Sequence, residues 1–224
     1  MCAMAQKAVQ QKPLRKDAAR NRQRILDAAY ELFAARGLAV TLNDIAHYAG
    51  VGVGTVYRHF PDREQLIDGL FEQRIDEVAA LLEEAVEDPD PWHGLTGFLE
   101  RNLALQAQDR GLRELILGAA GGFDRLARAR ARLYPIGARL IARAQEAGLL
   151  RADLEPQDLP LLQLMLSGVI DVSHDIAPEL WRRYLAIVIR GLRADAGPPE
   201  PLPAAPPPAE QVDRMMGAAW APKH

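Results

Sequence analysis

The chain has 224 residues, of which 49% are hydrophobic and 25% are charged, an ordinary composition for a protein with a sizeable core. The single cysteine, Cys2, excludes an intramolecular disulfide and a cysteine-based zinc site. The longest near-apolar run, 159–170, is too short for a membrane span of about 20 residues. The start lacks the apolar region of a signal peptide, so we expect a cytoplasmic protein.

The formal net charge of −3 is unevenly distributed along the chain. Residues 1–63 hold 10 Lys and Arg against 5 Asp and Glu, a balance of +5, and residues 64–224 hold 17 against 25, a balance of −8. A basic segment is the electrostatic footprint of phosphate-backbone binding. We therefore expect DNA to contact the N-terminal part of the chain and to be repelled by the rest.

Strand signals are scarce and Ala, Leu, Arg and Glu dominate, which predicts an all-helical protein. Residues 1–17 lack periodicity and are expected to form a flexible basic arm able to lie along DNA. A first helix is predicted from Ala18 to Arg36, with Gly37 as its C-cap. Its core-facing stripe consists of Ile25, Ala28, Ala29, Leu32 and Phe33.

The stretch 41–60, TLNDIAHYAGVGVGTVYRHF, is typical of two short helices joined by a tight turn. Thr41 and Asp44 can form a capping box, and Gly50 to Gly52 interrupt the first helix. In the second helix Val56 and Phe60 are predicted to point inward. The outward set is then Val53, Gly54, Thr55, Tyr57, Arg58 and His59. Small residues permit close approach to a surface, and hydroxyls, Arg and His reach phosphates or base edges in a major groove.

This stretch resembles the TetR family of transcriptional regulators, whose signature is A-x-x-A-G-V-S-x-G-T-x-Y-x-H-F-x-x-K-x-x-L. The matching residues are Ala46, Ala49, Gly50, Val51, Gly54, Thr55, Tyr57, His59, Phe60 and Leu66. Gly52 replaces the usual Ser, although Gly is also an acceptable N-cap, and Arg63 replaces the usual Lys with its charge kept. The close resemblance covers about residues 20–70; beyond them it is one of helix order and length.

The resemblance implies a homodimeric regulator that binds an inverted-repeat operator and is most simply a repressor relieved by a small molecule. The implied DNA-binding residues are Thr41, Val53, Gly54, Thr55, Tyr57, Arg58, His59 and Arg63. Tyr57, His59 and Arg63 are assigned to phosphates, and Thr55 and Arg58 to bases. The alternative is a helical dimer that binds a ligand or acts as an enzyme without binding an operator.

Six further helices are predicted, giving about nine in all. Their ranges are 62–86, 92–108, 112–117, 123–147, 158–173 and 178–193. A helix-turn-helix domain is expected over 18–62, a ligand-binding and dimerisation domain over 63–193, and a disordered Pro-rich tail over 194–224. The last two helices are apolar on more than one face, which requires either a partner or a buried central pair in a monomer. The resemblance implies dimerisation through them.

The resemblance also implies a ligand cavity among the helices of the second domain. Its candidate lining residues are Phe71, Phe98, Asn102, Leu105, Tyr134, Leu162, Gln163, Met165 and Leu166, although an apolar stripe at helical spacing is usually part of a core. The chain lacks catalytic and phosphate-loop motifs, so we expect neither an enzyme nor a cofactor. Asp171, His174 and Asp175 have a spacing that could hold a metal ion, but helix-dipole complementation by the histidine is the simpler interpretation, and we expect no metal.

Overall fold

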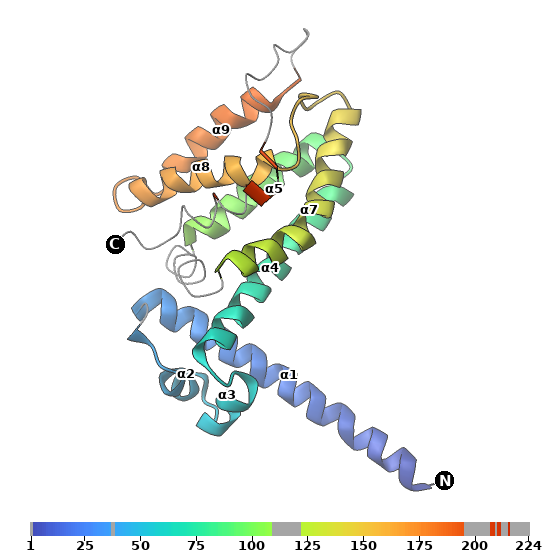
Figure 1. Ribbon diagram of the computed structural model, residues 1–224, viewed down its shortest axis with the longest axis vertical. Coiled ribbons are helices and arrows are strands. Elements are labelled where there is room, and N and C mark those ends of the chain that lie inside the picture. Colours follow the sequence, from blue (N-terminus) through green and yellow to red (C-terminus); the bar gives the residue numbers. More distant parts are fainter. Residues whose placement is uncertain are drawn as a thin grey trace. The chain divides into compact units, whose positions relative to one another are not determined.

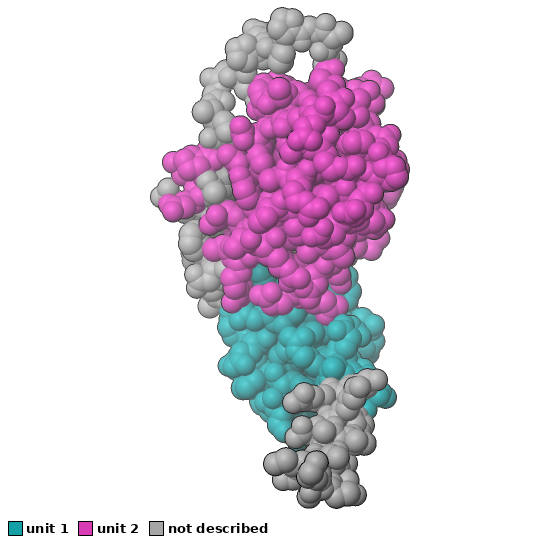
Figure 2. All heavy atoms as spheres, turned by 90° about the vertical axis from the view of Figure 1, so that its right-hand side faces the viewer, with its two compact units in different colours: residues 1–71 teal, residues 72–224 magenta. Residues whose placement is uncertain are grey.

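The computed structural model describes residues 2–36, 39–108, 122–194, 207–208, 210–211 and 215. Its described part is all-helical, as predicted, with eight helices (Figure 1). The chain divides into two compact units, Met1–Phe71 and Glu72–His224 (Figure 2). Among the described residues, none of the helices combines the length and hydrophobicity needed to cross a membrane.

Unit 1 contains α1 (Cys2–Arg36), α2 (Leu42–Ala49), α3 (Val53–His59) and the first turns of α4 (Arg63–Glu87). The predicted stripe of α1 is buried throughout: Ile25, Ala28, Ala29, Leu32 and Phe33. It packs against α2 and α3. The predicted centre of this core is confirmed, because Phe33, Ile45, Val56 and Phe60 are all at most 2% exposed.

The start of α1 differs from the prediction. The helix begins at Cys2, whereas the sequence suggested a flexible arm up to residue 17 and a helix from Ala18. Residues 3–12 are mostly Ala, Met, Gln and Lys, which favour a helix by intrinsic propensity even without an apolar stripe. Periodicity, the signal used for the prediction, reports burial and therefore misses such a helix. The expected C-cap Gly37 lies outside the described residues.

The two units divide within α4, at residues 71 and 72, and not at the expected position before it. The first turns of α4 bury four apolar side chains, Leu66, Ile67, Leu70 and Phe71. Gly69 explains how closely they pack: a Cβ there would lie 2.8 Å from the Phe60 ring and 3.1 Å from Leu26. These turns therefore belong to the core of unit 1.

Unit 2 contains the rest of α4, then α5 (Pro91–Gln108), α7 (Gly122–Glu146), α8 (Asp158–Ser173) and α9 (Leu180–Leu192). Helix α5 contacts α7, α8 and α9, and α8 packs along α9 (Figure 1). The predicted helix over 112–117 lies outside the described residues. So does the predicted tail, apart from five positions near its middle and Ala194; of these, Glu210, Gln211 and Met215 are helical.

Helix α9 is apolar on two faces, as the sequence indicated. One face, with Trp181, Leu185 and Leu192, is buried in the core of unit 2. The other carries Leu180, Tyr184 and Ile187 at helical spacing, and these side chains are 36–54% exposed. The adjoining helix α8 and the turn after it expose Met165, Val172 and Ile176, the last at 89%. Unit 2 thus presents an apolar surface along α8 and α9, termed here the α8–α9 face.

Candidate DNA-binding surface and ligand cavity

Helix α2 is fixed at both ends. At its start the predicted capping box is present: Thr41 Oγ1 accepts from the Asp44 amide, and the Thr41 amide donates to Asp44 Oδ2 at 2.9 Å. The bonds from Thr41 lower the pKa of Asp44. At its end Gly50 has φ +62°, and Arg24 of α1 donates to the Ala49 carbonyl at 2.7 Å. These contacts set the turn from which α3 begins.

Helix α3 presents the predicted outward face. Gly52, in place of the family's Ser, occupies the N-cap with φ −64° and ψ 140° and makes no side-chain cap bond. Val56 is buried, whereas Val53 and Tyr57 are 46% and 45% exposed. Gly54 and Arg58 are exposed, and Thr55 and His59 are half-buried. The outward set therefore forms one accessible surface.

Two arginines, one on this surface and one at the start of α4, make defined contacts. Arg58 lies back along the helix, donating from Nη2 to Thr55 Oγ1 at 3.0 Å and from Nε to the Gly54 carbonyl at 3.2 Å. The Arg63 guanidinium, at the start of α4, lies 5.3 Å from the centre of the Phe33 ring. Arg63 is half-buried, so its stem supports the core of unit 1 as well as carrying charge.

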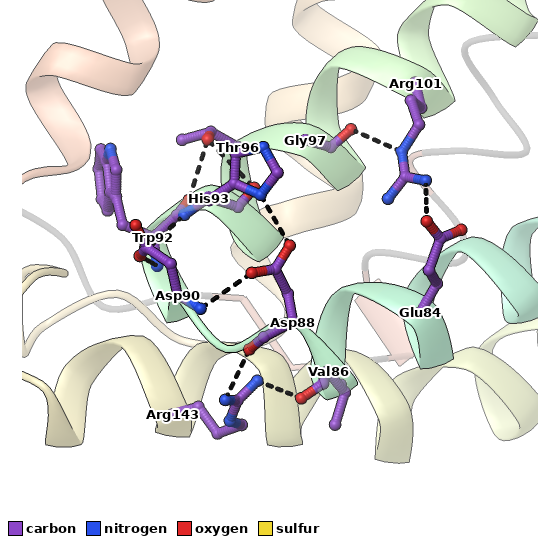
Figure 3. Close-up of polar contacts among 10 residues, drawn as sticks. All are labelled: Glu84, Val86, Asp88, Asp90, Trp92, His93, Thr96, Gly97, Arg101 and Arg143. Atoms are coloured by element: carbon purple, nitrogen blue, oxygen red, sulfur yellow. Dashed lines mark hydrogen bonds and ion pairs between the residues drawn. The ribbon is translucent and has the colours of Figure 1, made fainter.

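The end of α4 is tied to α5 and α7 (Figure 3). Arg143 of α7 donates to the carbonyls of Val86 and Asp88, acceptors left without helical partners at the end of α4. Asp88 Oδ2 contacts His93 Nδ1 at 2.7 Å, which raises the pKa of His93 and lowers that of Asp88. Glu84 pairs with Arg101 of α5 at 2.7 Å. The last turn of α4 is consequently anchored.

Ion pairs also join α4 to α7 along a regular series of positions. Glu72 pairs with Arg128 at 3.5 Å and Asp76 pairs with Arg132. Further along, Arg139 contacts Glu83 at 3.4 Å and Glu87 at 3.7 Å. The partners advance together on both helices, so α4 and α7 run in the same direction. Each pair is exposed and contributes little alone, but together they align the two helices.

A cavity of about 230 Å³ lies among these helices. Its walls come from α4, α5, α7, the turn at 156–157 and the start of α8. The lining residues are Val78, Leu82, Phe98, Leu126, Ala129, Arg130, Leu133, Tyr134, Gly137, Pro156, Gln157, Leu159, Pro160 and Gln163. Predominantly apolar walls with a few polar groups are typical of small-molecule sites.

The polar groups of the cavity are held by neighbours. Asn102, buried on α5, donates from Nδ2 to Gln163 Oε1 at 2.8 Å. Tyr134 donates its hydroxyl to Gln157 Oε1 at 3.4 Å, across the gap between α7 and the turn. Arg130 is half-buried. Among the lining residues in the described part of the chain, it carries the one full charge.

Three of the nine predicted lining residues, Phe98, Tyr134 and Gln163, do line the cavity, and Asn102 lies behind Gln163. The other five do not line it: Phe71, Leu105, Leu162, Met165 and Leu166. Phe71 belongs to unit 1, Leu166 is buried in the core, and Met165 is 54% exposed on the α8–α9 face. Core, cavity and surface stripes share one helical spacing, so periodicity does not separate them.

Arg130 was not among the predicted lining residues, although the sequence carries a signal for it. Leu126, Leu133 and Gly137 stand four before, three after and seven after Arg130, positions on one helix face. A cation in the middle of an apolar stripe is uncommon on a core-facing surface. In the described residues, no group of three His, Cys, Asp or Glu side chains is arranged to hold a metal ion.

Two known protein families match the chain, one within each of its two units. The family "Bacterial regulatory proteins, tetR family" matches residues 25–70, and "Transcriptional regulator SbtR-like, C-terminal domain" matches residues 90–194. The TetR transcription regulatory protein from Mycobacterium vanbaalenii has a solved structure with 33% identity and a TM-score of 0.64, and the similarity covers 81% of this chain and 99% of that one. The chain belongs to the TetR family of transcriptional regulators. It is therefore a DNA-binding regulator of a non-enzymatic family.

Three other known proteins show how far the likeness extends. A TetR regulator of Streptomyces coelicolor is 27% identical, with a TM-score of 0.62 over 78% of this chain and 99% of its own. SmeT, the repressor of a Stenotrophomonas maltophilia multidrug efflux pump, shares the fold at 24% identity, with a TM-score of 0.60 over 81% and 97% of the two chains. A helix-turn-helix regulator of Staphylococcus aureus is 42% identical over 64 residues, a match that spans 28% of this chain and 35% of the relative.

Proposed function

We propose that this TetR-family regulator is a cytoplasmic homodimeric repressor that binds an inverted-repeat operator and is released by a small molecule bound in unit 2. The observation that carries the proposal is the accessible face of α3, held by the capping box and Gly50 turn of α2. This arrangement presents hydroxyls, a guanidinium and an imidazole from a short helix whose start is held by that turn. A helix of this kind fits a major groove.

The proposed DNA contacts follow from the positions of the side chains. Tyr57, His59 and Arg63 are assigned to phosphates. Thr55 and Arg58, which contact one another, are assigned to base edges, where the Arg58 guanidinium would exchange its bond to Thr55 for base acceptors. The proposed DNA-facing surface also includes Thr41, Val53 and Gly54, which would lie close to the DNA backbone. Phosphate contacts orient the domain, and base contacts select the sequence.

The proposed dimer forms through the α8–α9 face. Leu180, Tyr184 and Ile187 of α9 form an exposed stripe beside the buried one, and Val172 of α8 and Ile176 in the turn after α8 are exposed as well. Contiguous apolar surface of this kind marks an interaction site. A second copy is the natural occupant because an isologous interface pairs the same two helices of each protomer. Two heads in one dimer would then require two half-sites.

The proposed release acts through α4. Val78 and Leu82 of α4 form one wall of the cavity, the end of the helix is anchored to α5 and α7, and its first turns belong to the core of unit 1. A ligand that prefers one position of α4 therefore changes the operator affinity by its difference in affinity between the two states, and the coupling is reciprocal. Moving the balance from 1:99 to 99:1 would take about 5.5 kcal/mol of differential binding.

The test is a mobility-shift titration with DNA flanking the regulator's own gene, against a scrambled duplex of equal length and composition at the same salt concentration. We expect a specific complex whose affinity falls steeply with salt. A thermal-shift screen then identifies ligands, and each is titrated into the complex. Equal affinity for both duplexes would refute operator binding. A tight ligand of unit 2 that leaves operator affinity unchanged would refute release through α4.

A further inference from the structure

Buried glycines of this chain differ in the space around them. A Cβ on Gly69 would lie 2.8 Å from its nearest neighbour, and one on Gly94 would overlap a backbone carbonyl. Gly137, on α7, is also buried, yet among the described residues a Cβ there would meet a single atom within 4 Å, Cδ1 of Leu159 at 3.8 Å. A close-packed interior leaves no such room. The space beside Gly137 therefore belongs to the cavity, which both Gly137 and Leu159 line.

The residue at position 137 sets the width of the cavity between α7 and the start of α8. Leu133, one turn earlier on α7, and Leu159 and Pro160 of α8 form the adjacent walls. A methyl group at position 137 would enter this space without displacing a described atom, because 3.8 Å is an ordinary distance between packed carbon atoms. Glycine at this position thus leaves room that any other residue would take from a ligand.

The charges of the lining indicate which ligands the cavity accepts. In the part of the chain that the structure describes, the walls are mostly apolar and include no Asp or Glu. Arg130, the charged lining residue, already has an interaction of its own within the protein. A charged ligand of either sign would therefore lose its hydration without meeting an unpaired opposite charge, which is costly in an apolar site. An uncharged ligand with an apolar body gains from burial instead.

Tyr134 gives such a ligand a place for one polar group. This side chain lines the cavity and is also 42% exposed, so the cavity reaches solvent beside it. Its hydroxyl donates to Gln157 Oε1 at 3.4 Å. Tyr134 and Gly137 stand three positions apart on α7 and share one face of the helix. A hydroxyl or similar group on the ligand can therefore remain close to water and to these polar side chains while the apolar body lies deeper.

We propose that the cavity binds an uncharged, largely apolar small molecule whose body lies against Gly137, and that Gly137 determines how bulky a body the cavity accepts. The inference deepens the proposed function, since it rests on the cavity being the effector site. It commits to a ligand class and to one residue that determines size selectivity.

The first experiment tests the ligand class with benzyl alcohol, benzoate and benzylammonium. These probes share a phenyl ring with one substituent carbon and carry charges of 0, −1 and +1. Each is titrated calorimetrically into the full-length protein at neutral pH. We expect benzyl alcohol to bind with a dissociation constant in the millimolar range or tighter, as suits so few atoms. Both ions should bind about tenfold or more weakly, because burial of a charge without a partner is costly.

The second experiment tests Gly137 with 4-ethylbenzyl alcohol, a bulkier uncharged probe. Its two extra carbons should strengthen binding to the wild-type protein about tenfold relative to benzyl alcohol. Gly137→Ala should reduce this preference about fivefold or more, because the added methyl takes room from the ligand. The urea-unfolding midpoint of the variant should be at least that of wild type, since Ala favours a helix more than Gly does.

The matched control is Gly97→Ala on α5. A Cβ at Gly97 would meet no described atom within 4 Å, and Gly97 is not among the residues that line the cavity. The control adds the same methyl group to a helix of the same unit. It should keep the wild-type preference for the bulkier alcohol within about twofold.

Several results would overturn the inference. They are binding of either ion at least as tight as that of benzyl alcohol, no binding of either alcohol at 10 mM or so, or equal size preferences in Gly137→Ala and Gly97→Ala. The mobility shift is measured separately on the same samples. Size-selective binding of the uncharged probes that leaves the operator complex intact would refute the proposed release and leave the ligand class standing, so the two failures are distinguishable.

Discussion

Substitution of Gly54, on the exposed face of α3, would distinguish an effect on stability from an effect on DNA binding. A Cβ built on Gly54 would meet no atom within 4 Å, so the fold itself does not require glycine there. Gly54→Ala should stabilise unit 1 by about 0.5–1 kcal/mol, the difference in helix propensity. If α3 enters the groove, the added methyl instead meets DNA. Crowding in a packed site costs about 1–3 kcal/mol, equivalent to a roughly 5- to 150-fold loss of operator affinity.

The two effects are measured on the same samples, by urea unfolding followed by circular dichroism and by fluorescence anisotropy with operator DNA at fixed salt. Gly97→Ala on α5 is the matched control, because a Cβ there also has no atom within 4 Å. It should gain stability and leave operator affinity within about twofold. Wild-type operator affinity for Gly54→Ala would show that this face of α3 does not approach DNA closely, and would refute the reasoning.

Three further predictions concern other parts of the chain. Gly94→Ala should destabilise unit 2 by about 1–3 kcal/mol in urea unfolding, because its Cβ would lie 2.3 Å from the Ala85 carbonyl oxygen; a stability equal to that of wild type would contradict the packing of the α4–α5 corner. Thr55→Val should change discrimination among operator bases in a competition assay more than it changes affinity for random DNA; a uniform change would move Thr55 to the phosphate contacts. The pKa of His93 is raised above 6.5 by Asp88, so its contribution to stability is present below pH 6.5 and is lost as the pH rises through the folded-state pKa. Thermal unfolding of His93→Gln should lack this part of the pH dependence, and an unchanged pH profile would show that the pair contributes nothing to stability.

The DNA-binding unit could be predicted almost completely from the sequence because its signals are local. The Thr41 capping box, the Gly50 turn and the inward positions of Val56 and Phe60 each depend on residues a few positions apart. The ends of the helices that the structure describes in unit 2 were also predictable to within about two residues, since Pro, Gly and charged residues mark them. The start of α1 was missed because its propensity for helix is not accompanied by an apolar stripe.

The lining of the cavity in unit 2 was predictable only in part, for a physical reason. Phe71, Leu166 and Met165 are apolar at helical spacing, yet one lies in the core of unit 1, one in the core of unit 2 and one on the surface. Which stripe meets which depends on contacts between helices far apart in the sequence. Arg130 could have been identified from the sequence as a lining residue, because a charge within an apolar stripe does not fit a sealed core.

Footprinting on the DNA flanking the regulator's own gene tests the central claim most directly. Two α3 helices in one dimer predict two protected half-sites, arranged as an inverted repeat and centred about 34–36 Å apart or a multiple of that helical turn. Protection of both half-sites at the same protein concentration would agree with the account. A single asymmetric half-site protected by a monomer, or no protection at any concentration that shifts the DNA, would contradict it.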